Sequence, residues 1–533
     1  MKQKKSGSYY TPPELSDFMV DHATNPFSHF QHEIKILEPS FGEGAFIKSL
    51  QKRIAAKKDF SFALDAVELD RRAFQAVSKS ITSCNFPLKI FNKDFLFFSD
   101  EDKTKYDLVI GNPPYIVKKL LSDKQERKCK SIHKYANLAD KSVNNIWTSF
   151  LASSVLKLSA NGILAFVLPF ELLQVKFAEE LRELLVKTFE RIEIFTFSKI
   201  IFSNIEQDTV LLFGYKKSKK KGLFFCQIDS AKDLYEGKYC LKKSNYLKEK
   251  PMKWSNHILT ENEMSLLFDI SNNLKLVDDY CNSAPGIVTA ANKYFIVTEK
   301  TAKKYKLKSI CRPIIQKGLF VNGKVDFDER DFDDLKNSGK PCYLLCFPDK
   351  NEDYFSDSIQ QYLQEGLESK IEKRFKCLKR DKWYRVSLIG ESDAFFFKRS
   401  HLYPKLLVNK TKTLVTDSAY RISAHAGYDV NSIAYSFYNS LTLAFAELYG
   451  RFYGGGVLEL TPNEFKSLPL PYINVSKREF RNFESIFERK KNINNVLNIV
   501  DNHILKETLK LNSKTIKNIN RIKNKLISRR IKV

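Results

Sequence analysis

The fold of the N-terminal half is indicated by one stretch, Asp107-Leu-Val-Ile-Gly-Asn-Pro-Pro-Tyr115. Its first residues form an apolar run typical of a buried strand, and two prolines then end that strand, because proline lacks a backbone N–H and fixes φ. We therefore expect Asn112 and Tyr115 on a stiff, extended turn at the carboxyl end of a strand. In an open α/β sheet, ligands bind at this edge.

Strand-like and helix-like stretches alternate on both sides of this motif, between residues 34 and 215, as in a wound α/β sheet. The expected strands cover residues 35–38, 63–68, 88–91, 106–110, 163–168, 191–196 and 209–215. The expected helices cover residues 45–56, 71–78, 146–158 and 176–188. Because the last two strands follow each other without a helix, the pattern predicts a Rossmann-like sheet that finishes with an antiparallel hairpin.

The residue types after strand 106–110 suit a substrate with an aromatic amine. Such an amine is a poor nucleophile, because its lone pair is delocalised into the ring. Two acceptors, the Asn112 side-chain oxygen and the Pro113 carbonyl, can hold the amine hydrogens and free that lone pair, while Tyr115 stacks on the base. Pro114 keeps the loop rigid. No general base is needed before attack, and no His or Glu suited to that role is apparent nearby.

Acidic residues at successive strand ends predict an adenosyl cofactor. The first expected strand leads into the turn Glu38-Pro-Ser-Phe-Gly42-Glu-Gly44, whose glycines let the backbone approach a ligand closely. Glu68 follows the second strand and can accept both ribose hydroxyls. Asp94 and Phe95 follow the third and can contact the amine and the ring of adenine. No phosphate-cradling loop is apparent, which fits an adenosyl group that carries a sulfonium instead of phosphates.

The charge balance favours a polyanionic partner. The 533 residues include 88 Lys and Arg against 62 Asp and Glu, a formal charge of +26. DNA or RNA is the commonest large polyanion, and an anionic membrane surface is the main competitor. A composition that is simply rich in lysine would give the same excess.

No part of the sequence indicates a secretion signal or a membrane span. The N-terminus has no apolar core of the kind that signal peptides contain. The most apolar stretch, residues 162–175, is shorter than the ~20 residues of a membrane helix and contains Glu171. The cysteines are scattered, Cys342 and Cys346 are interpreted as small buried hydrophobes, and no metal-ligand spacing appears, so no metal is expected. A reducing cytoplasm fits these features.

Together the motifs resemble those of the gamma-class adenine-N6 DNA methyltransferases of the TaqI type, which belong to type II restriction–modification systems. The resemblance is close over the expected sheet and looser beyond it. It implies that S-adenosyl-L-methionine is the methyl donor and that the acceptor is N6 of an adenine flipped out of double-stranded DNA. It also implies functional pairing with a separate restriction endonuclease.

The resemblance assigns the site residues one by one. As catalytic residues it implies Asn112, Pro113, Pro114 and Tyr115, with Phe202 against the flipped base. As cofactor-binding residues it implies Thr11, Glu38, Gly42, Gly44, Glu68, Asp94, Phe95 and Phe150.

Three domains follow from the pattern and the resemblance. Residues 1–245 are expected to form the catalytic domain, residues 255–472 a mixed α+β target-recognition domain that binds DNA, and residues 475–533 a basic helical tail. The stretches 286–295, 454–462 and 468–471 resemble target-recognition motifs, except that Ala290 stands where related sequences commonly have glycine. Candidate DNA contacts are Arg312, Lys410, Lys412 and Arg451.

Three other functions use similar motifs. Methyltransferases that act on RNA bases or on protein glutamine share the Asn-Pro-Pro-Tyr tetrapeptide, but they are generally shorter and lack a large C-terminal domain. A fused restriction–methylation enzyme would normally carry its nuclease before the first motif, which here begins at Gly7. A non-catalytic DNA-binding protein on the same fold is disfavoured by the intact tetrapeptide and the acidic strand ends.

Overall fold

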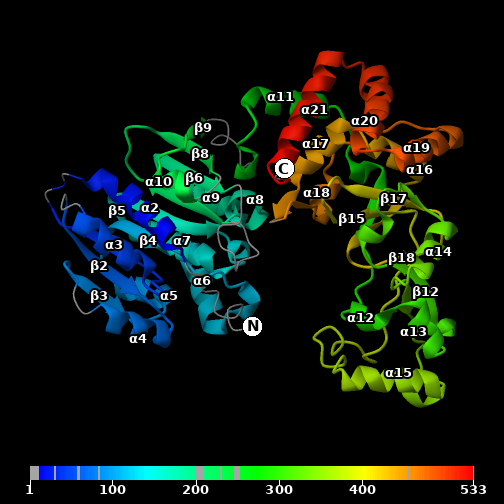
Figure 1. Cartoon of the computed structure of the whole chain (residues 1–533), viewed down its shortest axis with the longest axis horizontal. Helices are drawn as coiled ribbons and strands as arrows, with labels where there is room; N and C mark the ends of the chain where they lie inside the picture. Colours follow the sequence, from blue (N-terminus) through cyan, green and yellow to red (C-terminus); the bar gives the residue numbers. More distant parts are fainter. Residues whose placement is uncertain are drawn as a thin grey trace. The chain divides into compact units, whose positions relative to one another are not determined.

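The computed structural model describes residues 11–28, 30, 32–56, 60–81, 84–197, 209–228, 231–244, 253–453 and 455–531. The chain divides into two compact units, Met1–Ile258 and Leu259–Val533. Figure 1 shows the first in blue to green and the second in green to red.

The first unit is built on one nine-stranded sheet. Its strands are β1 (Ile34–Glu38), β2 (Phe62–Val67), β3 (Leu88–Phe91), β4 (Tyr106–Gly111), β5 (Leu158–Pro169), β6 (Arg191–Phe197), β7 (Thr209–Tyr215), β8 (Gly222–Ile228) and β9 (Lys242–Ser244). They are arranged in the order β3-β2-β1-β4-β5-β7-β6-β8-β9. The first five of these are parallel neighbours, and β7 is antiparallel to both β5 and β6. The chain order therefore reverses direction between β1 and β4, and ligands bind at such a switch point in open sheets.

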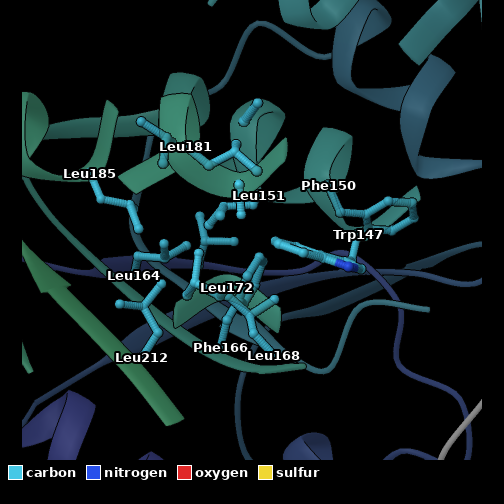
Figure 2. Close-up of a cluster of buried hydrophobic side chains, with 14 of the residues drawn as sticks. Trp147, Phe150, Leu151, Leu164, Phe166, Leu168, Leu172, Leu181, Leu185 and Leu212 are labelled. Carbon is cyan, nitrogen blue, oxygen red and sulfur yellow. The ribbon is translucent and has the colours of Figure 1, made fainter. Parts of the chain in front are cut away.

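Helices cover both faces of this sheet. One hydrophobic core contains side chains of α2 (Pro13–Thr24), α3 (Ala45–Ala56), α4 (Arg71–Ser80) and α10 (Ala231–Tyr235). A second contains side chains of α5 (Phe95–Glu101), α6 (Asp123–Tyr135), α7 (Ile146–Lys157), α8 (Glu171–Gln174) and α9 (Glu179–Thr188). Figure 2 shows part of the second core, where Trp147 and Leu151 of α7 pack over Phe166 and Leu168. Every residue of β7 is buried, as expected for a strand covered on both faces.

The predicted α/β fold is confirmed, and several elements have their predicted bounds. Strands 88–91 and 209–215 and helix 45–56 match the structure. The helix predicted at 176–188 is divided into a 3₁₀ turn (Lys176–Ala178) and α9. β5 begins at Leu158, five residues before the predicted start at 163.

The prediction that the sheet finishes with an antiparallel hairpin needs a correction. β6 and β7 are antiparallel, as predicted, but β8 pairs in parallel with the other side of β6, and β9 pairs with β8. Leu223 and Phe225 of β8 are buried in the second core. Without β8, the largely buried strand β6 would expose an apolar edge, which is a site for aggregation.

The second unit holds three smaller sheets. Its strands are β10 (Cys281–Pro285), β11 (Ile296–Val297), β12 (Cys311–Ile315), β13 (Asp326–Phe327), β14 (Tyr343–Leu345), β15 (Ala394–Phe397), β16 (Arg399–Ser400), β17 (Lys405–Asn409), β18 (Leu414–Val415), β19 (Ala419–Ala424), β20 (Arg451–Tyr453) and β21 (Val457–Glu459). The sheet orders are β10-β19-β15-β17-β13, β11-β14-β12-β18 and β16-β21-β20.

Helices join and flank these sheets. They are α11 (Glu261–Ser271), α12 (Asn292–Phe295), α13 (Glu299–Lys304), α14 (Glu329–Asn337), α15 (Asp357–Glu368), α16 (Val430–Phe437), α17 (Ser440–Tyr449), α18 (Pro462–Lys466), α19 (Lys477–Arg489), α20 (Ile493–Asp501) and α21 (Ser513–Ser528). Cys342 is fully buried in the core of this unit, and Cys346 packs against that core.

The C-terminal segment is helical, as predicted, and packs within the second unit. Helix α21 contacts α17. After α21, the Arg530 side chain is fully buried. Its Nε donates to the two carboxylate oxygens of Glu447 at 3.1 and 2.8 Å, and its Nη1 donates to the Gly456 carbonyl at 2.6 Å. Because an unpaired buried charge is very unfavourable, this ion pair fixes the chain end against α17.

None of the helices in the described ranges combines the length and the apolar character of a membrane span.

Candidate active site

The predicted site residues lie at one edge of the large sheet. In the paired registers, Glu38 of β1 is beside Ala66 of β2, and Val67 is beside Phe91 of β3. β4 pairs in parallel with β1 and ends one residue before Asn112. Since the carboxyl ends of parallel strands meet at the same edge, residues that follow these four strands share that edge.

Hydrogen bonds hold both the side chain and the backbone of Asn112. Its side-chain nitrogen donates to the hydroxyl of Thr11 at 3.2 Å, and its backbone carbonyl accepts from the hydroxyl of Ser40 at 3.1 Å. Directly before it, Gly111 is packed so closely that an added Cβ would lie 3.3 Å from Cδ of Pro39. The turn after β1 therefore holds the Asn112 backbone, and Thr11, just before α2, holds the side-chain amide.

Tyr115 is buried, with 8% of its surface exposed. Its hydroxyl lies 3.1 Å from the Asn112 side-chain oxygen and 3.2 Å from the carbonyl oxygen of Val167. The tyrosine thus connects the loop after β4 to the end of β5. The loop Asn112–Tyr115 is a packed part of the unit, as its two prolines predicted.

The glycine turn after β1 has the conformation that its glycines permit. Gly42 and Gly44 have φ of +52° and +75°. The Gly42 amide donates to a carboxylate oxygen of Glu68 at 2.9 Å, and the amide of Asp70 donates to the other at 2.7 Å. Burial raises the pKa of the Glu68 carboxyl, although these backbone bonds oppose the shift. Glu68 therefore holds the turn and keeps further lone pairs for a ligand.

Glu38 is fully buried. Neither of its carboxylate oxygens has a hydrogen-bond partner among the described residues. Burial, and then the nearby charge of Glu68, hold the pKa of the Glu38 carboxyl well above its ordinary value. Its Cγ would lie 3.9 Å from a Cβ built on Gly111, so this carboxyl is directly beside the end of β4. A buried polar group without a partner is rare and needs a physical reason.

The remaining predicted cofactor residues meet at the start of α5. Asp94 caps this helix by accepting from the Leu96 amide at 3.0 Å, and its other oxygen accepts from the Gln125 side chain at 3.0 Å. Phe95 and Phe150 are both buried, with ring centroids 5.0 Å apart. In Figure 2, Phe150 lies beside Trp147 on α7. The structure thus brings together residues that are widely separated in sequence.

Some predicted residues lie outside the part of the chain that the structure describes, and some residues that contact the site were not predicted. Phe202 and residues 7–10 lie outside the described residues. Ser40 and Gln125 were not predicted. A lone serine carries no signal of its own, whereas Gln125 closes a capping box with Ser122 at the start of α6, and that spacing could have been recognised.

Three of the four candidate DNA contacts are engaged in ion pairs within the second unit. Arg312 contacts Glu391 at 3.0 Å, Arg451 contacts Glu464 at 3.1 Å, and Lys410 contacts Asp326 at 2.7 Å. Lys412 is exposed and has no ion pair in the part of the chain that the structure describes. An Arg or Lys already paired with a carboxylate is a weaker candidate for a phosphate, because that carboxylate repels the phosphate.

Sequence comparisons match both halves of the chain. The family described as Eco57I restriction-modification methylase matches residues 45–202, and the family described as Type II methyltransferase M.Eco57I, C-terminal domain, matches residues 251–505. The Type II methyltransferase M.AccI of Acinetobacter calcoaceticus is 24% identical over 404 residues, which cover 72% of this chain and 69% of M.AccI. M.HincII of Haemophilus influenzae is 30% identical over 227 residues, which cover 41% of this chain and 38% of M.HincII.

Solved structures share the fold. The Type IIL restriction-modification enzyme MmeI, solved in complex with DNA, aligns with a TM-score of 0.60 at 11% identity, over 97% of this chain and 75% of MmeI. The DrdV–DNA complex aligns with a TM-score of 0.51 at 13% identity, over 95% of this chain and 58% of DrdV. At these identities the alignments establish the fold. The family matches confirm the resemblance to type II restriction–modification methyltransferases.

Proposed function

We propose that this chain, a relative of the Eco57I-like type II restriction–modification methyltransferases, transfers a methyl group from S-adenosyl-L-methionine to N6 of an adenine flipped out of double-stranded DNA. The observation that carries the proposal is the fixed Asn112 amide at the carboxyl end of β4, beside the glycine turn and the buried Glu38. Adenine specificity, base flipping and the cytoplasm as the place of action are parts of the same proposal.

The residues present fit a cationic adenosyl cofactor. Glu38 offers a buried carboxyl that has no hydrogen-bond partner among the described residues, and a positively charged group beside it would stabilise its ionised form. Glu68 stands at the glycine turn with lone pairs free for ribose hydroxyls. Asp94, Phe95 and Phe150 would flank the adenine ring. When bound, the cofactor supplies a methyl group on a sulfonium.

The residues of the catalytic loop would act by orientation. Since the Asn112 nitrogen donates to Thr11, the Asn112 side-chain oxygen is presented as an acceptor. This oxygen and the Pro113 carbonyl would accept the two hydrogens of the amine, which brings the lone pair of N6 out of conjugation and toward the donor. The rigid loop keeps both oxygens in position before the substrate arrives, so little reorganisation is needed during transfer.

DNA would be held mainly by the second unit. Its family match is to the C-terminal domain of M.Eco57I, and the whole chain is strongly basic. An N6 amine inside a duplex is reached only after the adenine leaves the stack, so the enzyme must grip the duplex while the base is extruded. We further propose that the methylation protects host DNA from a separate restriction endonuclease.

The experiment is a transfer assay with three classes of acceptor. The purified chain is incubated with methyl-labelled S-adenosyl-L-methionine and, in separate reactions, with duplex DNA, RNA or protein. The proposal expects label in DNA, lost in Asn112→Ala and kept in Asn144→Ala, a control at an exposed asparagine of the same unit. Label in RNA or protein but not in DNA would establish one of the alternative functions.

A further inference from the structure

The strongest exposed cluster outside the active site is an irregular segment of the second unit, residues 370–385, here named the basic loop. It contains eight Lys and Arg residues and two Asp and Glu residues. Two large apolar side chains in it are exposed, Phe375 at 70% and Leu378 at 67%. Figure 1 shows the loop in yellow-green after α15, beside α12. Single exposed hydrophobic residues are common, but two within a run of cations are a distinct combination.

The basic loop is anchored to the core of the second unit. Ile371, Cys377 and Tyr384 are buried in that core. The Tyr384 hydroxyl also donates to the carbonyl of Lys350 at 2.8 Å. Because buried residues alternate with exposed ones, Phe375 and Leu378 are held outward. The loop therefore loses little conformational entropy when a partner contacts them.

Two arginines connect the basic loop to the motif at residues 286–295. Arg380 donates to the carbonyls of Val288 and Thr289 at 3.2 and 3.0 Å, and Arg374 donates to the carbonyl of Ala290 at 3.2 Å. Ala290 has a φ of +68°, a conformation that L-residues rarely adopt. Strained backbone persists only where the surroundings enforce it, and here the arginines satisfy the carbonyls of the strained segment.

The other cations of the basic loop differ in their contacts. Lys382 and Arg385 both pair with Asp349, at 3.1 and 2.6 Å. Lys373 and Lys376 are exposed, and within the described ranges neither has an acidic partner. Lys379 lies over the ring of Phe375, with 4.5 Å between its nitrogen and the ring centroid. Unpaired cations thus flank the two exposed apolar side chains.

We infer that the basic loop is a DNA-contacting element, in which Lys373 and Lys376 bind backbone phosphates while Phe375 and Leu378 make apolar contact with the bases or sugars of a groove. Architectural DNA-binding proteins combine cations with inserted Phe or Leu side chains in this way. The inference rests on the proposed function and extends it, because it names the element and divides its residues between charge and apolar contact. An anionic lipid surface is the competing partner, and the test separates the two.

The test is an anisotropy titration of the full chain with a labelled, mixed-sequence DNA duplex at several salt concentrations. The double variant Lys373→Gln/Lys376→Gln should bind DNA more weakly, and the slope of log Kd against log salt should fall by about 0.9 for each phosphate that is no longer neutralised. Phe375→Ala and Leu378→Ala should each weaken binding roughly tenfold, the scale of burying one apolar side chain, with the salt slope unchanged. All four side chains are exposed, so folding is expected to be retained.

Matched controls keep the result interpretable. Leu319→Ala removes another leucine of the second unit that is 70% exposed. Lys187→Gln/Lys232→Gln removes two exposed lysines of the first unit. If the parent binds DNA and the loop variants bind it as the controls do, the inference is overturned. Parent protein that fails to bind DNA at every salt concentration would overturn the proposed function as well. Loop variants that lose binding to phosphatidylglycerol vesicles but keep DNA binding would assign the loop to a lipid surface.

Discussion

The hydroxyl of Tyr115 lies 3.1 Å from the side-chain oxygen of Asn112 and is also within reach of the carbonyl of Val167, at 3.2 Å. A phenol has one proton to donate, so these two acceptors share it. When a substrate amine donates to Asn112, the proton of Tyr115 can turn to Val167 without any movement of the ring. The Tyr115 hydroxyl therefore keeps a hydrogen bond whether or not a substrate amine occupies the Asn112 oxygen.

This relationship predicts different effects for two substitutions of Tyr115. Tyr115→Phe keeps the buried ring and removes only the hydroxyl, so the rate of methyl transfer should fall by about tenfold or less, which is the scale of one hydrogen bond. Tyr115→Ala removes the ring itself and leaves a cavity under the loop after β4, so the rate should fall much further. Single-turnover transfer at saturating cofactor measures both. A phenylalanine variant as inactive as the alanine variant would show that the hydroxyl does more than hydrogen-bond to Asn112 and Val167.

Glu38→Gln should reduce the pH dependence of stability. Because the pKa of Glu38 in the folded protein is raised above its ordinary 4.5, the stability that this group contributes is fully present below pH 4.5 and is lost as pH rises through the raised pKa. Glutamine stays neutral, so without cofactor the variant should lose less stability over that range than the parent. It should also bind S-adenosyl-L-methionine more weakly, because the charge that faces the cofactor is gone.

Thermal unfolding at several pH values, with and without S-adenosyl-L-methionine, measures both effects of Glu38→Gln. Glu14→Gln at an exposed carboxylate of α2 is the control. Equal pH dependence in parent and Glu38→Gln would contradict a buried Glu38 carboxyl with a raised pKa.

Glu68→Ala should weaken cofactor binding by roughly 10- to 100-fold, the scale of hydrogen bonds to a charged group, with little change in DNA affinity. The variant loses both the expected ribose acceptor and the bond that fixes the Gly42 amide. Asp70→Ala is the matched control, because Asp70 is a neighbouring carboxylate that caps α4 through the amides of Arg72 and Ala73. Calorimetric titration with S-adenosyl-L-methionine separates the two variants. A Glu68→Ala variant that loses DNA affinity but keeps cofactor affinity would contradict the assignment of Glu68 to the cofactor.

Ala290→Gly should stabilise the protein by about 1 kcal/mol, because glycine adopts a φ of +68° without the clash that an L side chain suffers. The sequence resemblance already singled out this position, since related sequences commonly have glycine there. Ala302→Gly, inside helix α13, is the control and should destabilise by a similar amount. Chemical denaturation measures both changes. A destabilised Ala290→Gly variant would mean that the methyl group of Ala290 packs usefully against the nearby core.

The sequence was most informative where a strand ends in prolines or glycines. The prolines after Gly111 and the glycines at 42 and 44 restrict the backbone locally, so their neighbours could be placed at one sheet edge without knowledge of distant contacts. Strands 88–91 and 209–215 were also predictable, because their apolar runs are short and clearly bounded.

Features that depend on contacts between residues far apart in the sequence could not be predicted from local patterns. The Glu38 carboxyl is buried without a partner in the part of the chain that the structure describes, and this depends on how β1 meets the loop after β4, whereas the sequence shows only a carboxylate before a proline. Likewise, β8 pairs with β6 instead of its sequence neighbour β7, which periodicity cannot reveal. The ion pairs of Arg312 and Arg451 follow from the tertiary structure of the second unit, so their charge alone suggested DNA contacts.

The most direct test of the central claim is a mass-spectrometric measurement of N6-methyladenine in plasmid DNA from cells that express either the parent chain or Asn112→Ala, in a host without its own adenine methyltransferases. We predict N6-methyladenine in DNA from the parent, confined to one short recognition sequence, and none from Asn112→Ala, whose purified form should still bind S-adenosyl-L-methionine. Equal N6-methyladenine with both chains, or a methylated base other than adenine with the parent, would contradict the account.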